Sequence, residues 1–238
     1  MYKRQVVGAE ALVRWQHPVR GMVPPASFIP IAEETGIVVQ LDRWVLAQAC
    51  RFAADAHRRG QRFRVSVNIS PRQFTEDDFV QHVQQCLVDA GLTAAALTLE
   101  VTEGVLVHDI DAVAHTMRAL THIGVRFALD DFGTGYSSLS YLHRLPLAEL
   151  KIDRSFVQGG PNEPGQAAVV DAMIAVAGGL KLEIVAEGVE TAEQADFILR
   201  RAPHALLQGY RFSRPTEAAQ WSPEPSPQKS EGAPSASA

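Results

Sequence analysis

The chain has 238 residues, of which 46% are hydrophobic and 21% are charged, with a formal net charge of −5. This composition excludes disorder throughout the chain and suits one large domain or two small ones. The negative charge argues against a nucleic-acid polymer as partner. No uncharged apolar stretch approaches the ~18 residues of a membrane span. The two cysteines lie in helix-like patterns, which favours a reducing, cytoplasmic setting over a disulfide framework.

Short apolar, β-branched runs alternate along the chain with longer stretches of helical period. This alternation is typical of βα units and a mostly parallel sheet. The predicted strands are Val6–Val13, Phe63–Asn68, Leu97–Val101, Arg126–Leu129, Glu149–Ile152, Glu183–Ala186 and Ala205–Leu207. The predicted helices are Phe28–Thr35, Val38–Arg59, Glu76–Ala90, Ile110–Ile123, Ser138–Arg144, Gln166–Gly178 and Ala192–Arg200. Thr75 and Thr191 each precede acidic residues and are expected to cap the helices that follow them.

Seven strands are one fewer than a (β/α)8 barrel needs to close. Because only five residues precede Val6, we expect the chain to begin after the first strand of such a barrel. From Ser222 onward the sequence is rich in Ser, Pro and Ala and holds no apolar residue larger than alanine. We therefore predict one domain over residues 1–221 and a disordered tail over residues 222–238.

Polar and ionisable residues stand at the carboxyl end of every predicted strand. Any one of them could be a solvated loop residue or a helix cap. In a parallel barrel, however, these strand ends converge on one face, where active sites are built, so their recurrence favours a shared site. The residues are Glu10, Asn68, Glu100, Asp130, Asp131, Lys151, Asp153, Glu187 and Gln208.

The acidic members of this set and Asn68 offer only oxygen atoms to a ligand. Carboxylates brought together near a buried rim repel one another unless cations lie among them. Oxygen ligands favour Mg2+, Mn2+ or Ca2+ over zinc. The adjacent Asp130 and Asp131 can serve two ions at once, and two ions ~3.5–4 Å apart suit phosphoester hydrolysis.

Three further features each allow a catalytic and a simpler interpretation. Lys151 could stabilise negative charge on a phosphorane, or it could form a structural ion pair with Asp153. Arg14 could bind a phosphate through its guanidinium, or it could face solvent. The glycines of Asp130–Ser138 could present N–H groups to an anion, or they could form an ordinary turn.

Several strings of this sequence resemble the EAL-domain family of cyclic di-GMP phosphodiesterases. They span about Val6 to Pro215, in the family's order and at similar spacing. The strings are Glu10-Ala11-Leu12-Val13-Arg14-Trp15, Asn68-Ile69-Ser70, Glu100-Val101-Thr102-Glu103, Asp130-Asp131-Phe132-Gly133-Thr134-Gly135, Lys151-Ile152-Asp153, Glu187-Gly188-Val189-Glu190 and Gln208-Gly209-Tyr210.

The resemblance implies a modified TIM barrel in which two ions, Mg2+ or Mn2+, support hydrolysis of cyclic di-GMP to linear pGpG. It implies that Lys151 orients water or neutralises charge beside Asp153, and that Glu103 anchors the loop 131–138 near a dimer interface. It also implies substrate contacts from Arg14, with Gln208 positioning water or metal. The implied metal ligands are Glu10, Asn68, Glu100, Asp130, Asp131 and Glu187.

The resemblance also raises two expectations about the rest of the protein. Family members usually begin with a strand that carries a Tyr-Gln-Pro-Ile-like segment, and this chain does not contain one, which agrees with the count of seven strands. Such domains commonly follow sensor or GGDEF cyclase modules. The main alternative to a phosphodiesterase is a non-catalytic receptor or interaction domain for cyclic di-GMP, although all the implied metal ligands are present. Set apart from the resemblance, a TIM-barrel hydrolase for another phosphoester would also fit the residues.

Overall fold

A computed structural model describes residues 5–107, 109–133 and 142–221 of the chain. Three predictions fall wholly or partly outside this range. They are the tail 222–238, most of the helix Ser138–Arg144 and the part of the Gly-rich loop from Thr134 to Ser138.

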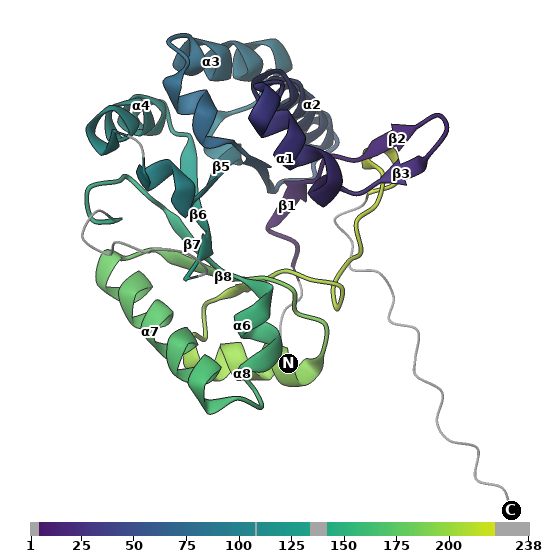
Figure 1. Cartoon of the computed structure of the whole chain (residues 1–238). Coiled ribbons are helices and arrows are strands. Elements are labelled where there is room, and N and C mark those ends of the chain that lie inside the picture. Colours follow the sequence, from purple (N-terminus) through teal and green to yellow (C-terminus); the bar gives the residue numbers. More distant parts are fainter. Residues whose placement is uncertain (1–4, 108, 134–141, 222–238) are drawn as a thin grey trace, which may run out of the picture.

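A seven-stranded parallel sheet forms the centre of the molecule (Figure 1). Each neighbouring pair of strands is parallel. All seven predicted strands are confirmed, and their parallel order agrees with the expected α/β fold of the EAL-type TIM-like barrel. In order across the sheet they are β1 (Gly8–Ala11), β4 (Arg64–Asn68), β5 (Leu97–Thr102), β6 (Arg126–Phe132), β7 (Glu149–Ile152), β8 (Glu183–Ala186) and β9 (Leu206–Leu207).

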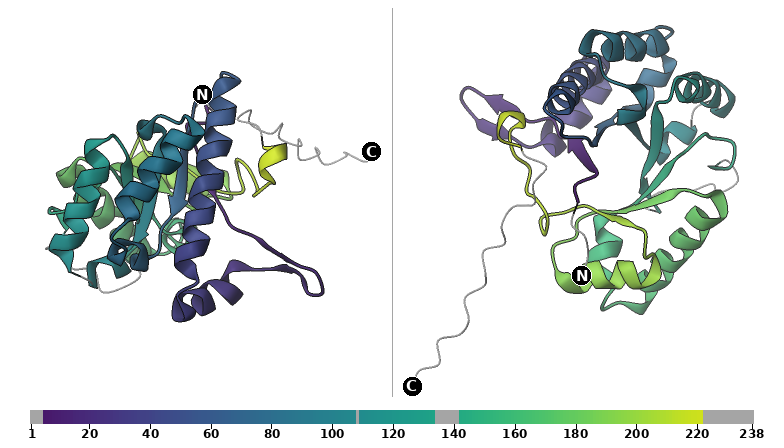
Figure 2. Two further views of the ribbon diagram at one scale, coloured as in Figure 1. Left: turned by 90° about the horizontal axis from the view of Figure 1, so that it is seen from above. Right: turned by 180° about the vertical axis from the view of Figure 1, so that it is seen from behind.

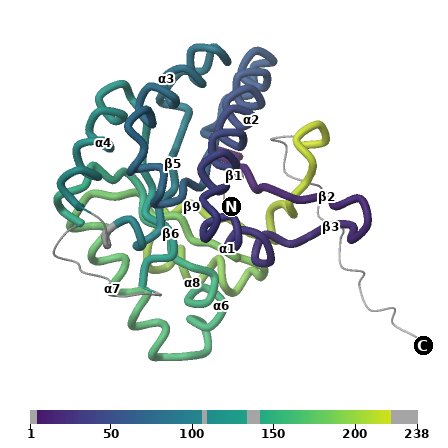
Figure 3. Tube along the Cα trace, turned by 45° about the horizontal axis from the view of Figure 1, so that its top comes forward, coloured from purple at the N-terminus to yellow at the C-terminus, as the bar shows by residue number. Residues whose placement is uncertain are grey.

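Helices surround the strands on the outside of the sheet (Figure 3). α2 packs against β4, α4 packs against β6, and α7 packs against β7 and β8. Their bounds are α1 (Pro25–Thr35), α2 (Val38–Arg58), α3 (Phe79–Ala90), α4 (Ile110–His122), α6 (Arg154–Gly159), α7 (Pro164–Leu180) and α8 (Ala192–Arg201). Short 3-10 helices are η1 (Pro71–Thr75), η2 (Ala94–Ala96), η3 (Glu103–Val107) and η4 (Ala218–Gln220). No helix in the described part of the chain is long and apolar enough to cross a bilayer.

An antiparallel hairpin of β2 (Trp15–His17) and β3 (Gly21–Val23) projects to one side of the sheet (Figure 2). The hairpin and α6 were not predicted, because their runs of three to six residues are too short to show a period.

Two predicted helix starts had different outcomes. Thr191 caps α8 as expected, and its side chain and that of Gln194 form a reciprocal capping box. The prediction that Thr75 caps a helix from Glu76 is wrong. Thr75 ends η1, and α3 starts at Phe79 after Asp78. Glu76, which follows η1, has an extended backbone (φ −86°, ψ 122°), so the helical turn ends there and α3 starts separately.

Along each strand, side chains point alternately to the two faces of the sheet, and the two faces differ in polarity. Apolar residues such as Val65, Leu99 and Leu129 are buried and belong to the hydrophobic core beneath the helices. Because strand side chains alternate with a period of two, the intervening residues share the opposite, inner face. Polar residues occupy that face in several strands, including the buried Thr98, Glu100, Glu149 and Lys151. The fold therefore places ionisable side chains in the interior of the curved sheet.

Two layers of charge lie along this inner face. The layer at the amino ends of the strands is an ion-pair network among Arg64, Arg126, Glu149 and Glu183, with nitrogen–oxygen distances of 2.8–3.7 Å. Arg64 on β4 reaches Glu183 on β8, and three strands separate these two in the sheet. The sheet must therefore curve strongly, as a barrel wall does, and its carboxyl ends converge at the opposite layer.

Candidate active site

Lys151 lies at the centre of the second layer of charge. Its side chain is 1% exposed, and its Nζ lies 2.6 Å from Glu100 Oε2, 2.6 Å from Glu187 Oε1, 3.2 Å from Asp130 Oδ2 and 3.9 Å from Glu10 Oε2. These four carboxylates come from the carboxyl ends of four different strands or the residue just after them. The prediction that they meet at one point is confirmed.

The simpler interpretation of Lys151, a structural ion pair with Asp153, is wrong. Among the described residues, the ion pairs of Lys151 go to the four carboxylates above and not to Asp153. Asp153 instead caps α6, where its Oδ1 accepts hydrogen bonds from the N–H and the hydroxyl of Ser155.

Glu10 connects the two outer strands of the sheet to the cluster. Its Oε1 accepts a hydrogen bond from Asn68 Nδ2 at 2.7 Å, and its Oε2 accepts one from Gln208 Nε2 at 2.6 Å. Asn68 ends β4 and Gln208 follows β9. In the described part of the chain, β1 and β9 share no backbone ladder, so this side-chain bridge joins the two edges where the site lies.

Asp130 and Asp131 stand at an irregularity of β6. Leu129 pairs with Leu150 and Phe132 pairs with Ile152, so β6 holds one more residue than β7 over this stretch. Asp131 has a φ of 54°, and its N–H donates to Asp130 Oδ1 at 2.8 Å. Neighbouring residues of a regular strand point to opposite faces, and a bulge changes this direction. The bulge therefore explains how adjacent carboxylates can serve the same site.

Burial and mutual repulsion raise the pKa values of several acidic groups in the cluster. Burial raises the pKa of Glu100 to about 8 and that of Glu187 to about 7, against the lowering effect of Lys151. Burial and the neighbouring Asp130 also raise the pKa of Asp131. Burial alone would lower the pKa of Lys151, but the surrounding carboxylates outweigh it and hold that pKa well above its usual value. The ammonium group therefore stays charged at neutral pH.

The remaining predicted site residues lie at the margin of the cluster. Glu103 is half-buried, and its Oε1 accepts a hydrogen bond from the N–H of Gly133 at 2.8 Å. This contact supports the turn that follows Asp130 and Asp131. Arg14 is exposed and donates to the carbonyl of Val13, so the structure does not bring its guanidinium into the cluster.

One buried carboxylate close to the site was not predicted. Asp42, on α2, is 9% exposed and accepts a hydrogen bond from the N–H of Ser70, two residues beyond Asn68. Its signal in the sequence is a charged residue at helical spacing between the apolar Val38 and Leu46.

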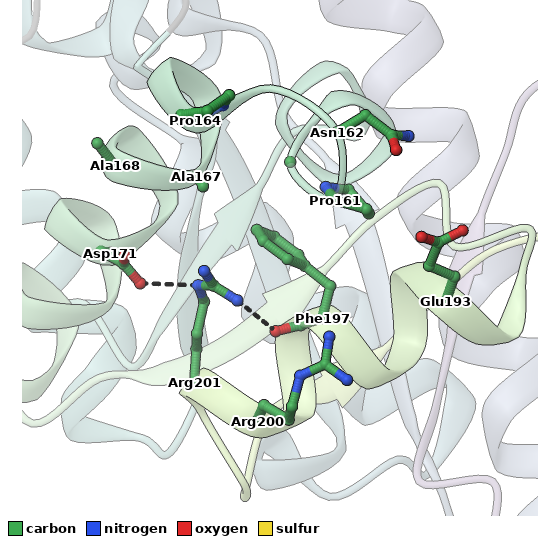
Figure 4. A pocket seen from close by; sticks show the side chains of 11 residues that line it. Pro161, Asn162, Pro164, Ala167, Ala168, Asp171, Glu193, Phe197, Arg200 and Arg201 are labelled. Atoms are coloured by element: carbon green, nitrogen blue, oxygen red, sulfur yellow. Dashed lines mark hydrogen bonds and ion pairs between the residues drawn. The ribbon is translucent and has the colours of Figure 1, made fainter.

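A cavity of about 460 Å3 lies elsewhere, between α7 and α8 and the chain before α7 (Figure 4). None of its lining residues is a predicted site residue. Arg201 there forms an ion pair with Asp171 at 2.9 Å, and its guanidinium lies 4.0 Å from the centre of the Phe197 ring. Because no predicted site residue lines this cavity, we place the candidate site at Lys151.

Comparison with known proteins finds similar sequences that are named cyclic di-GMP phosphodiesterases. The chain is 47% identical over 207 residues to the cyclic di-GMP phosphodiesterase NbdA of Pseudomonas aeruginosa, covering 87% of this chain and 26% of that protein. It is 43% identical over 219 residues to the bifunctional diguanylate cyclase/cyclic di-GMP phosphodiesterase MucR of the same organism, covering 90% of this chain and 31% of that protein. The chain thus spans about a quarter to a third of the length of these relatives.

Solved structures share the fold. The MucR phosphodiesterase in complex with c-di-GMP matches with a TM-score of 0.85 and 43% identity, over 90% of this chain and 87% of that chain. The EAL enzyme Bd1971, in its cAMP- and cyclic-di-GMP-bound form, matches with a TM-score of 0.86 and 33% identity, over 91% of this chain and 60% of that chain. The EAL domain model matches residues 1–215, and the chain therefore belongs to the EAL domain family.

Proposed function

We propose that this chain hydrolyses cyclic di-GMP to linear pGpG in a metal-dependent reaction. The observation that carries the proposal is the convergence of four carboxylates on the buried ammonium of Lys151 at the carboxyl ends of the strands. Relatives with 43–47% identity are named cyclic di-GMP phosphodiesterases, which supports this substrate over other phosphoesters.

The donor chemistry of the cluster fits hard divalent cations. In the described ranges, no group of three or more His, Cys, Asp or Glu side chains is arranged to hold a metal ion, and Glu100 and Glu187 each lie 2.6 Å from Lys151 Nζ. Even so, one ammonium cannot balance four carboxylates, and Asp131 adds a fifth beside them. Oxygen-only sites of this kind suit Mg2+ or Mn2+. In the proposal the ions are held by Glu10, Asn68, Glu100, Asp130, Asp131 and Glu187.

When bound, such ions would activate water and offset the negative charge of the phosphate. Glu187 is suited to accept a proton from the attacking water, because a pKa of about 7 leaves it substantially ionised near neutral pH. The water oxygen then forms a bond to phosphorus as the bond to the leaving ribose oxygen breaks, and that oxygen takes up a proton from solvent to give the free hydroxyl of pGpG. Lys151 stays charged and stabilises the negative charge that develops on the phosphate.

The other predicted residues have supporting roles in the proposal. Arg14 contacts a substrate phosphate once its exposed side chain turns toward the site. Gln208 and Asn68 hold Glu10 and border the space in which substrate would lie. Glu103 positions the turn at Gly133, and Asp153 caps α6, which begins three residues after Lys151.

The proposed partners follow from the similarity of this chain to EAL-domain proteins. Cyclic di-GMP is the proposed ligand, and a homodimer and GGDEF or sensor domains in a longer parent protein remain predictions. Sedimentation of the purified chain tests the homodimer directly. The curated relatives are three to four times as long as the matched region, which supports additional domains in the parent protein.

The deciding experiment incubates purified protein with cyclic di-GMP and Mg2+ or Mn2+, with and without EDTA, and follows pGpG by chromatography. We expect product only with metal, and none from Asp130→Asn. Asp77→Asn, an exposed aspartate before α3, is the matched control and should retain turnover. Binding of cyclic di-GMP without product would favour the receptor alternative. Turnover of Asp130→Asn at the wild-type rate would refute the assignment of the metal ligands.

A further inference from the structure

Asp42 lies on the buried face of α2, outside the cluster of charges around Lys151. Val38, Leu46 and Ala49 are buried on the same helix face at spacings of three and four residues. A carboxylate in this position is costly to bury unless it is hydrogen-bonded. Its presence among apolar neighbours therefore points to a specific partner.

That partner is the chain segment directly after β4. Asp42 Oδ2 accepts a hydrogen bond from the N–H of Ser70 at 2.9 Å. Three residues further on, the buried Gln73 donates from Nε2 to the carbonyl of Val39 at 2.8 Å. Two hydrogen bonds thus join one turn of α2 to the start and the end of the segment 70–73.

This segment follows a residue of the candidate active site. The N–H of Ile69 still donates to the carbonyl of Glu100 at 2.9 Å, in continuation of the β4–β5 ladder. Ser70 is the next residue, and its N–H goes to Asp42 instead of to a strand. Asn68 is exposed, and its side chain reaches Glu10 at 2.7 Å. The bond to Asp42 therefore fixes the direction in which the chain leaves Asn68.

We infer that Asp42 is a positioning residue that holds Asn68 in place for Glu10 and for the proposed metal, acting through the backbone of Ile69 and Ser70. This inference rests on the proposed function. Removal of the carboxylate leaves the N–H of Ser70 without its acceptor, so the turn after Asn68 can move. Residues that orient a metal ligand in this way typically affect metal affinity or activity about 10- to 100-fold.

The test compares the wild type with Asp42→Ala and Asp42→Asn. Asparagine keeps an oxygen that can accept from Ser70, whereas alanine does not. Asp55→Ala, an exposed position of the same helix, is the matched control. For each protein, titration calorimetry gives the Mn2+ dissociation constant, turnover of cyclic di-GMP gives kcat/KM, and NMR follows the side-chain amide of Asn68. All measurements are made well below each variant's Tm.

We expect Asp42→Ala to weaken Mn2+ binding and lower kcat/KM about tenfold or more. We also expect it to shift the Asn68 amide signals. Asp42→Asn should restore the Mn2+ dissociation constant and kcat/KM to within about twofold of the wild type, and it should return the Asn68 signals to their wild-type positions. In an Asn68→Ala background, Asp42→Ala should have little further effect, because the two act through one contact. A fall in Tm with unchanged Mn2+ affinity and unchanged Asn68 signals would overturn the inference. So would additive effects of Asp42→Ala and Asn68→Ala on Mn2+ affinity and kcat/KM. Failure of the wild type itself to bind metal or form pGpG would refute the proposed function, and the Asn68 signals would still test the positioning.

Discussion

Gln208 donates a hydrogen bond to Glu10 at 2.6 Å across 198 positions of the sequence, and so joins the end of the last strand to the first. The same carboxylate accepts from Asn68 through its other oxygen. The orientation of Glu10 in the candidate site therefore depends on both edges of the sheet.

We expect Gln208→Ala to lower kcat/KM by about tenfold, because Glu10 loses one of its two amide donors and can rotate. Gln208→Glu should be more damaging, since it places a second carboxylate against Glu10. Turnover of cyclic di-GMP at saturating Mg2+ measures both effects. If both variants keep wild-type turnover, the bridge has no part in the site.

Glu103 supports the turn after the two adjacent aspartates through the N–H of Gly133. We expect Glu103→Ala to reduce turnover, because the turn at Gly133, two residues after Asp131, loses its hydrogen bond to Glu103. Glu103→Gln keeps an acceptor oxygen and should retain most of the activity. Equal losses in the two variants would show that the charge of Glu103, and not this hydrogen bond, is what matters.

Much of the candidate site could be predicted from the sequence because the fold is parallel. Once strands were recognised, their carboxyl ends had to converge, and this placed Glu100, Lys151 and Glu187 together without any knowledge of the side-chain geometry. The direction of Asp131 could not be predicted, because it depends on one extra residue in β6 relative to β7. Bulges are set by pairing with a neighbouring strand and leave no local pattern.

Other features depend on tertiary contacts that no short segment reveals. Asp42 could be noticed as a charge on an apolar helix face, but its partner Ser70 lies 28 positions away. The network of Arg64, Arg126, Glu149 and Glu183 is formed only when the sheet curves. The start of α3 was misplaced because Thr75 resembles a helix cap in sequence and ends η1 in the structure.

The network at the amino ends of the strands should contribute to stability. Glu149 is buried and faces both Arg64 and Arg126, at 3.7 and 3.1 Å. We expect Glu149→Ala to lower the free energy of unfolding by about 1.5–3 kcal/mol, because two guanidinium groups then lose their buried partner and keep only Glu183. Urea denaturation monitored by circular dichroism measures this change.

Glu183 provides the matched comparison for Glu149. It faces the same two arginines, but its side chain is 49% exposed. Because water can solvate the two arginines in place of an exposed carboxylate, Glu183→Ala should lower the free energy of unfolding by about 1 kcal/mol or less. Similar losses for the two variants would show that burial does not govern the strength of this network.

Asp42 should make the stability of the protein depend on pH. Burial, with a smaller contribution from Glu33, raises the pKa of Asp42 from 3.8 to about 6, although its bonds to Ser70 lower it. The folded state therefore holds this proton more tightly than the unfolded state does. The resulting stabilisation is fully present below pH 3.8 and is lost as the pH rises through about 6.

The side chain of Asp42→Asn cannot ionise. The pH dependence of the difference between its unfolding free energy and that of the wild type therefore gives the contribution of Asp42 ionisation to stability. Between about pH 4 and pH 6.5, we expect the unfolding free energy of the variant to rise relative to that of the wild type by a total on the order of 2–3 kcal/mol. Above that range the difference between the two should be constant. Urea titrations at half-unit pH intervals measure it, with Asp55→Asn as the exposed control on the same helix. A difference that stays constant from pH 4 to pH 7 would mean that Asp42 ionises in the folded state as readily as in the unfolded chain.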